Sequence, residues 1–332
     1  MIRRSLTALG AAVLSLASFS SLAQEDIPKL NIKATNSYLQ TQPAGQAMDL
    51  FAKRVSELSN GRMTVQVYHA GKLYTEDASI QAVLDGTVQM GMASAANHGP
   101  FTKAWSPVET PFLLNRQQFR DIIINGEIGQ ELRKQAQADG LYPLMILESG
   151  GHRIVGGRKE VKVPSDMAGA KIRTAQSSVI LGFYKAVGAN PVVVPWGETY
   201  LALSNGVVDG VDATTSSWPL GKLTEVAKHI TTINWAPTST VVDTSVDWWN
   251  KRTPKQKEIL TQAAAEAQAY SMKLEDDFQQ SVRAQIKEQG GIIYDPSPAE
   301  LEQWREASKK VWATIPGDQS IIKKISEMTA AK

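Results

Sequence analysis

The sequence predicts an α/β protein built as two lobes, and three observations carry this expectation. Apolar runs of strand type alternate with helical patterns over most of the chain. Once a predicted leader is removed, about 309 residues remain in a chain of 42% apolar composition, enough for a core shared between two lobes. One predicted helix is also longer than a single lobe is wide, and we expect it to tie the lobes together.

The predicted strands are short runs of alternating or wholly apolar residues bounded by turn residues. The run 63–68 alternates as a half-buried strand does, whereas 141–147 is almost wholly apolar, which is typical of a strand covered on both faces. The full set of predicted strands is 30–34, 63–68, 88–93, 141–147, 153–155, 171–173, 191–194, 207–212, 230–235 and 239–248.

The predicted helices show apolar periodicity and end at glycine-containing turns. The first begins near Pro43 and ends before Gly61. Thr75 supplies a hydroxyl cap for the next helix, and the acidic first turn of Glu76 and Asp77 suits the positive end of the helix dipole. Further helices are predicted at 116–138, 179–187 and 198–203.

The longest predicted helix begins at Thr253, a capping residue, with Pro254 at the first helical position, where its missing N–H costs nothing. No residue breaks the pattern before Gly290. At about 1.5 Å per residue the helix reaches about 50 Å. Because unbroken helices of this length are uncommon, two helices with a kink near Ser271 are the alternative.

The first 23 residues, 1–23, read as an export signal. Arg3 and Arg4 precede a short apolar stretch at 6–19, and a small-x-small pattern ending at Ala23 places the mature start near Gln24. An uncleaved membrane anchor is the alternative, but the stretch is short for a span. No later apolar run is long enough to cross a membrane, so a soluble periplasmic protein is expected, and the absence of cysteine excludes a lipoprotein anchor.

Composition excludes several classes of function. Without cysteine there are no disulfides, thiolate metal sites or thiol nucleophiles. The leader's two arginines account for the net charge of +2 and leave 33 basic and 33 acidic residues. The chain therefore has no excess of positive charge of the kind that binds nucleic acid. No H-E-x-x-H, Walker, G-x-G-x-x-G or G-x-S-x-G motif occurs, and the serine loop at 91–95 departs from the last of these. We therefore expect no catalytic residue, metal or cofactor.

Two arginines and one tryptophan indicate a binding site instead. Arg153 and Arg173 each present a planar fork of donors that matches a carboxylate, which lysine does not. Each arginine, taken alone, is also explained as a surface residue or a structural ion pair. Trp196 directly follows a predicted strand, where α/β proteins place ligand contacts, although core packing is the alternative.

Several ordered motifs resemble one family. They are KIR at 171–173, GFYKAVGA at 182–189, ETYLAL at 198–203 and GVVDG at 206–210, preceded by FAKRV at 51–55, NGR at 60–62 and AGKL at 70–73. The chain resembles the solute-binding proteins of TRAP transporters, the DctP type, over about 30–290. The resemblance implies a two-lobed periplasmic binding protein fold that closes around its ligand. It also implies a receptor without chemistry of its own, which hands an organic acid to an ion-driven membrane permease.

On this resemblance, the boundaries are expected at 24–150 for the first lobe, completed by about 239–278, and at 151–238 for the second, completed by about 279–332. The family's carboxylate-clamping arginine falls on Arg173. The other ligand-binding residues implied or considered nearby are Arg153, Trp196, Asn36, Ser94, Asn97, His98, Asp212 and Thr214. A monomer is expected.

The sequence departs from the family pattern after 206–210. Ala213 stands where many members carry an amide, and Ser94 stands where sialic-acid-binding members carry a carboxylate. Sialic acid is therefore disfavoured, and a smaller or less hydroxylated acid is expected, with hydroxyls from Thr214 and Thr215. A C4-dicarboxylate stays possible, because two arginines can hold two carboxylates.

Three alternatives remain at this stage. An ABC-type binding protein shares the two-lobed principle but serves an ATP-driven permease. An exported hydrolase or lyase acting on an acid needs a general base near Arg173, for which His152 and Asp212 are the candidates. A purely structural protein is disfavoured because the sequence is neither repetitive nor of low complexity.

Overall fold

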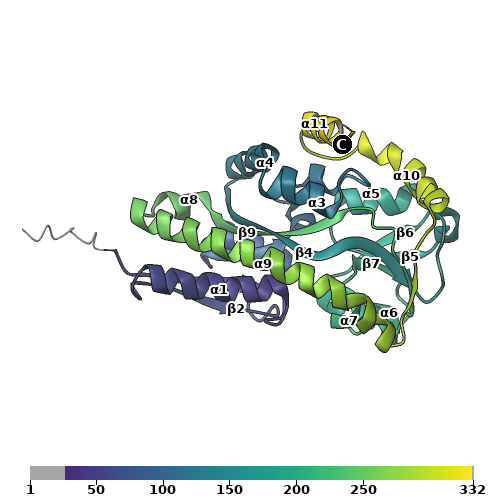
Figure 1. Ribbon diagram of the computed structural model, residues 1–332, viewed down its shortest axis with the longest axis horizontal. Helices are drawn as coiled ribbons and strands as arrows, with labels where there is room; N and C mark the ends of the chain where they lie inside the picture. The colour runs from purple at the N-terminus through teal and green to yellow at the C-terminus, as the bar shows by residue number, and fades with distance from the viewer. Residues whose placement is uncertain (1–26, 331–332) are drawn as a thin grey trace, which may run out of the picture.

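The computed structural model describes residues 27–330, and the predicted leader and the predicted mature start at Gln24 lie outside them. Figure 1 shows an elongated molecule in which helices flank a long run of strands, and the two C-terminal helices lie together along one edge. Strands and helices alternate along most of the chain. The predicted α/β class is therefore confirmed.

The strands follow the order β2-β1-β3-β9-β4-β7-β5-β6, with β8 and β10 off this path. β1 is parallel to β2 and β3, β5 is parallel to β6 and β7, and β9 is antiparallel to both β3 and β4. The bounds are β1 Leu30–Asn36, β2 Met63–Tyr68, β3 Met90–Ser94, β4 Leu141–Gly157, β5 Lys171–Thr174, β6 Asn190–Val193, β7 Gly210–Thr214, β8 His229–Thr231, β9 Pro237–Ser245 and β10 Ile292–Tyr294.

We call the part built on β1, β2 and β3 lobe I, and the part built on β5, β6 and β7 lobe II. Strand β4 joins them, because it pairs with β9 beside lobe I and then with β7 in lobe II. β8 extends lobe II by pairing antiparallel with β4, and β10 pairs parallel with β8. The predicted two-lobed fold is thus confirmed, with β4 and β9 as the crossing strands.

Helices cover the sheets of both lobes (Figure 1). Their bounds are α1 Pro43–Leu58, α2 Glu76–Leu84, α3 Arg116–Phe119, α4 Glu127–Ala138, α5 Ser178–Ala186, α6 Thr199–Ser204, α7 Ser217–Leu220, α8 Val246–Asn250, α9 Pro254–Glu288, α10 Pro298–Trp312 and α11 Gln319–Ala330. In lobe II, the buried ring of Phe183 on α5 stacks on Trp235 with centroids 4.4 Å apart. This aromatic packing fixes the back of the lobe II sheet.

Helix α9 is one continuous helix of 35 residues, so the alternative of two kinked helices is wrong. It begins with a capping box, in which Thr253 Oγ accepts from the Gln256 N–H at 3.2 Å and Gln256 Oε1 accepts from the Thr253 N–H at 3.1 Å. The helix packs on α1 and β4 in lobe I and reaches α7 and β10 in lobe II. Figure 1 shows it running along both lobes, as the sequence predicted.

Strand β4 differs from the prediction, which placed separate strands at 141–147 and 153–155. The structure has one strand of 17 residues with a register shift between Glu148 and His152. Gly150 and Gly151 lie in this irregular part with φ of +79° and +85°, a left-handed conformation that glycine adopts without strain. Two glycines therefore bend the strand where it passes from one lobe to the other, and its pairing continues on both sides.

The strand predicted at 239–248 ends earlier, at Ser245. The Ser245 hydroxyl accepts from the Trp248 N–H at 3.1 Å and caps the short helix α8, so Trp248 is helical. At the start of α2, Thr75 is at the capping position, but its side chain makes no capping hydrogen bond. Thr75 lines the cavity that lies between the lobes.

Candidate ligand-binding cavity

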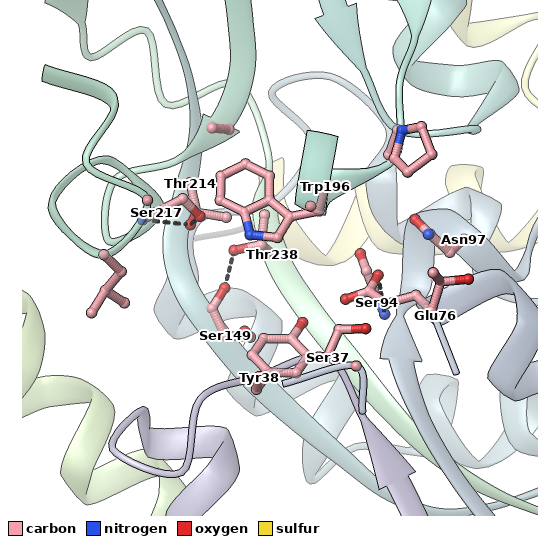
Figure 2. A pocket seen from close by; sticks show the side chains of 18 of the residues that line it. Ser37, Tyr38, Glu76, Ser94, Asn97, Ser149, Trp196, Thr214, Ser217 and Thr238 are labelled. Atoms are coloured by element: carbon pink, nitrogen blue, oxygen red, sulfur yellow. Dashed lines mark hydrogen bonds between the residues drawn. The ribbon is translucent and has the colours of Figure 1, made fainter. Parts of the chain in front are cut away.

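A cavity of about 540 Å³ lies between the two lobes. The parallel strands of both lobes end at it, which is where open α/β sheets place ligands. Lobe I contributes mainly polar side chains, among them Ser37, Tyr38, Glu76, Asp77, Ser94 and Asn97. Lobe II contributes Arg153, Arg173, Trp196, Asp212, Thr214 and Ser217, and the crossing strands add Ser149 and Thr238. Figure 2 shows Trp196 between the Thr214–Ser217 pair and the group formed by Glu76, Ser94 and Asn97.

Arg173, on β5, is a buried cation without an ion-pair partner among residues 27–330. Its side chain is 6% exposed. Its Nε donates to the Val194 carbonyl at 2.9 Å and its Nη1 to the Asp212 carbonyl at 3.4 Å, so neutral acceptors hold it in place. Burial lowers the pKa of Arg173 to about 10. The guanidinium is still charged at neutral pH, and an anion in the cavity would compensate that charge.

Arg153, on β4, is equally buried at 6% exposed but is already paired. Its Nη1 donates to Asp212 Oδ1 at 2.7 Å and its Nη2 to Glu109 Oε1 at 2.9 Å. Burial lowers the pKa of Arg153, but the two carboxylates outweigh that effect and leave the pKa raised. Two carboxylates thus balance the charge of Arg153, while its Nε is buried without a hydrogen-bond partner among residues 27–330.

Asp212, on β7, lines the cavity and is the centre of a buried network. Besides Arg153, its carboxylate accepts from the Tyr184 hydroxyl at 3.0 Å and from the Trp235 indole N–H at 3.2 Å. Glu109 is held in turn by the Ser177 hydroxyl at 2.9 Å. Burial raises the pKa values of Asp212 and Glu109. These contacts make the network part of the scaffold that positions the β4, β5 and β7 strands.

Trp196 begins a short 3₁₀ turn after β6 and lines the cavity with 36% of its surface exposed. The alternative of a core tryptophan is therefore wrong. The Arg173 guanidinium lies 5.3 Å from the centre of its ring, within the range of a cation–π contact. The indole thus stabilises the cation and presents an apolar face to the cavity.

Seven of the nine sequence-predicted residues come together in the cavity wall; they are Arg153, Arg173, Trp196, Ser94, Asn97, Asp212 and Thr214. The Thr214 hydroxyl bonds Ser217 Oγ at 2.5 Å. The Ser94 N–H donates to Glu76 Oε2 at 3.3 Å, and the side chain of Asn97 hydrogen-bonds Asp77.

Asn36 and His98 differ from the prediction, because both lie outside the cavity lining and are fully buried. The amide of Asn36 accepts from the Tyr38 N–H at 3.0 Å, which positions Tyr38 in the wall. His98 bonds the Ser94 carbonyl at 2.8 Å and Asp243 Oδ2 at 2.7 Å. Both therefore support residues of the wall from behind, since their polar atoms already have partners in the protein.

Sequence reasoning named Asp212 but missed Glu76 and Asp77 in the cavity wall and Glu109 behind it. In the sequence, Glu76 and Asp77 are explained as the acidic first turn of a helix. Nothing in that pattern indicates that they also line the cavity. Glu109 carried a usable signal, because a lone carboxylate among apolar residues needs a buried partner. His152, a candidate general base, does not line the cavity, and burial lowers its pKa to about 4.

Comparison with known proteins decides the family. The model of the bacterial extracellular solute-binding proteins, family 7 (DctP), matches residues 36–317. This chain belongs to that family. The C4-dicarboxylate-binding periplasmic protein DctP of Vibrio cholerae is 30% identical over 94% of either chain. The resemblance to TRAP transporter solute-binding proteins is thus confirmed.

Solved structures agree with this assignment. A TRAP periplasmic solute-binding protein from Sulfurospirillum deleyianum with bound succinate is 28% identical, with a TM-score of 0.82 over 90% of this chain and 99% of that one. A relative from a Polaromonas species bound to D-erythronate is 25% identical, with a TM-score of 0.84 over 90% and 98% of the two chains. This DctP-family protein is therefore a solute-binding receptor and not an enzyme, and the ABC-type alternative is set aside.

No helix within residues 27–330 combines the length and apolar character that crossing a bilayer requires. Within the same residues, no three His, Cys, Asp or Glu side chains are grouped as a metal site.

Proposed function

We propose that this DctP-family protein captures a small organic carboxylate between its lobes in the periplasm and delivers it to the membrane permease of a TRAP transporter. The unpaired charge of Arg173 carries the proposal. A buried cation held only by carbonyls and an indole lowers stability unless an anion joins it. A carboxylate is a planar acceptor that matches the guanidinium fork. The relatives that bind succinate and D-erythronate support this class of solute.

In this binding mode each part of the wall has a separate role. Arg173 supplies the charge match, and Trp196 gives an apolar surface against which the carbon skeleton packs. Thr214, Ser94 and Asn97 offer polar atoms around it. Arg153 acts through Asp212, whose backbone carbonyl accepts from Arg173. Arg153 is therefore a positioning residue, whereas Arg173 contacts the solute.

Binding also closes the lobes around the solute in this proposal. The cavity takes its walls from both lobes, and β4 passes between them through Gly150 and Gly151. A hinge at element-spanning residues is a common route to closure. Small-angle scattering should show a smaller radius of gyration at saturating ligand. Identical curves with and without ligand would contradict closure.

A thermal-shift screen tests the proposed function. Mature protein is heated with a library of organic acids, each paired with its uncharged primary amide. The expected result is a raised Tm for one group of acids and no rise for the matching amides, because only the carboxylate compensates Arg173. If the amides raise Tm as much as the acids do, the protein does not recognise the carboxylate group and the proposal is wrong.

The proposed location and assembly are tested on the native gene product. Mass spectrometry of protein exported by its host should give a mature chain beginning near Gln24, recovered in the periplasmic fraction. Light scattering coupled to size exclusion should give the mass of one chain. An intact leader in the membrane fraction would favour the anchor alternative.

A further inference from the structure

The wall that lobe I presents to the cavity is acidic and has no cation of its own. Glu76 and Asp77 both line the cavity at the start of α2. The Glu76 carboxylate accepts a long hydrogen bond from the Ser94 N–H, at 3.3 Å. Asp77 Oδ1 is buried and finds no hydrogen-bond partner in the described part of the chain, while Asn97 hydrogen-bonds the same carboxyl group. Acceptor atoms are therefore left over on this side.

These acceptors differ from the other carboxylates near the cavity. Asp212 and Glu109 are each paired with Arg153, whereas neither Glu76 nor Asp77 forms an ion pair among residues 27–330. Burial raises the pKa values of Glu76 and Asp77, and the charge of Arg173 across the cavity opposes that rise. The unpaired cation and the unpaired acids thus face one space from opposite lobes.

This arrangement constrains both ends of the solute. An ionised carboxylate accepts hydrogen bonds and donates none. A second carboxylate on the solute, placed against Glu76 and Asp77, would add like charge without a donor and would be repelled. Arg153 does not add an unbalanced positive charge for a second carboxylate, since Glu109 and Asp212 already neutralise it.

We infer that the solute is a monocarboxylate whose other end carries hydrogen-bond donors, either hydroxyl or ammonium groups, received by Glu76 and Asp77. The inference rests on the proposed function, because the carboxylate at Arg173 sets the orientation of the solute. It removes C4-dicarboxylates from the expected ligands. It also makes Glu76 and Asp77 residues that determine specificity.

Matched solutes test the inference on the native protein. Calorimetry compares acids that share a carboxylate and a carbon chain and differ at the far end: 4-hydroxybutyrate and 4-aminobutyrate against succinate, and D-gluconate against D-glucarate. The donor-ended acid of at least one set should bind about tenfold tighter than its diacid, the worth of one charge-assisted hydrogen bond. The hydroxyl and ammonium members distinguish the two kinds of donor.

Substitutions then test the two residues. Glu76→Gln and Asp77→Asn keep the shape but add an amide donor and remove a charge, so the preference over the diacid should fall by about tenfold. Glu127→Gln is the matched control, because Glu127 is an exposed acid in the first turn of α4, away from the cavity. Circular dichroism and Tm of the ligand-free variants report whether each remains folded.

The possible failures are distinguishable. Diacids that bind as tightly as the donor-ended acids would overturn this inference and leave carboxylate capture intact. Unchanged preference in both folded variants would remove Glu76 and Asp77 from the site. No binding by any member of either set would contradict the proposed function itself, and this inference with it.

Discussion

Arg153 and Arg173 lie on strands of the same lobe, are buried to the same extent and line the same cavity, yet their surroundings are opposite. Two carboxylates neutralise Arg153. Within residues 27–330, Arg173 instead donates to carbonyl oxygens and lies over the ring of Trp196. The pKa of Arg153 is raised, whereas burial lowers the pKa of Arg173 to about 10.

The two side chains are chemically identical, but their surroundings suit Arg153 to a structural role and Arg173 to the proposed binding of a ligand. A buried arginine whose donors meet carboxylates stabilises the fold mainly by preventing unpaired charges, and its removal leaves those charges behind. A buried arginine without such a partner costs stability in the empty protein and regains it from a ligand. Each prediction below tests one side of this contrast.

The largest effect is expected from Arg153→Met. The substitution leaves Glu109 and Asp212 buried without their cation, so the free energy of unfolding should fall by about 3–5 kcal/mol. Urea denaturation of the ligand-free protein at neutral pH measures this change.

Arg173→Met is the matched control for that measurement. Because the pKa of Arg173 is lowered in the folded state, its charge opposes folding at every pH below about 10, and this penalty declines only as the pH rises from there toward the higher pKa of an arginine in the unfolded chain. Its removal should therefore leave stability at neutral pH unchanged or increased. Equal losses in the free energy of unfolding of the two variants would show that Arg153 and Arg173 do not differ in their contribution to stability.

The next effect concerns affinity. Arg173→Lys keeps a positive charge but loses the planar fork, so binding of the carboxylate should weaken by about 10- to 150-fold while the fold is kept. Isothermal titration calorimetry measures the loss. Arg158→Lys serves as control, because Arg158 also donates to backbone carbonyls in lobe II but lies outside the cavity. Unchanged affinity in folded Arg173→Lys protein would remove Arg173 from the site.

The smallest effect is expected from Trp196→Ala. The ring contributes packing and one cation–π contact, worth about 0.5–1 kcal/mol at a half-exposed position, so affinity should fall about two- to fivefold. The ligand-induced change in tryptophan fluorescence should also shrink, since Trp218 and Trp235 are fully buried. A variant that binds as tightly as the parent, with the full signal, would show that the indole is not over the solute.

Much of the fold was predictable because its signals are local. Thr253 and Pro254 marked the start of α9, and the alternation of 63–68 marked β2 with its observed bounds. Predictions failed where distant pairing overrides local preference. Gly150 and Gly151 looked like a break, but β4 stays one strand because β9 and β7 pair with it on either side.

The site shows the same division between local signals and distant contacts. By its motifs, the sequence identified the family, and it singled out the two arginines and Trp196, which line one cavity, because a guanidinium matches a carboxylate and Trp196 follows a strand. It did not distinguish the roles of Arg153 and Arg173, since Glu109 is 44 residues and Asp212 is 59 residues from Arg153 along the chain. Nor did it reveal the acidic wall, where Glu76 and Asp77 serve both the helix dipole and the cavity. Charge compensation depends on which groups folding brings within a few ångströms, and only the tertiary structure decides that.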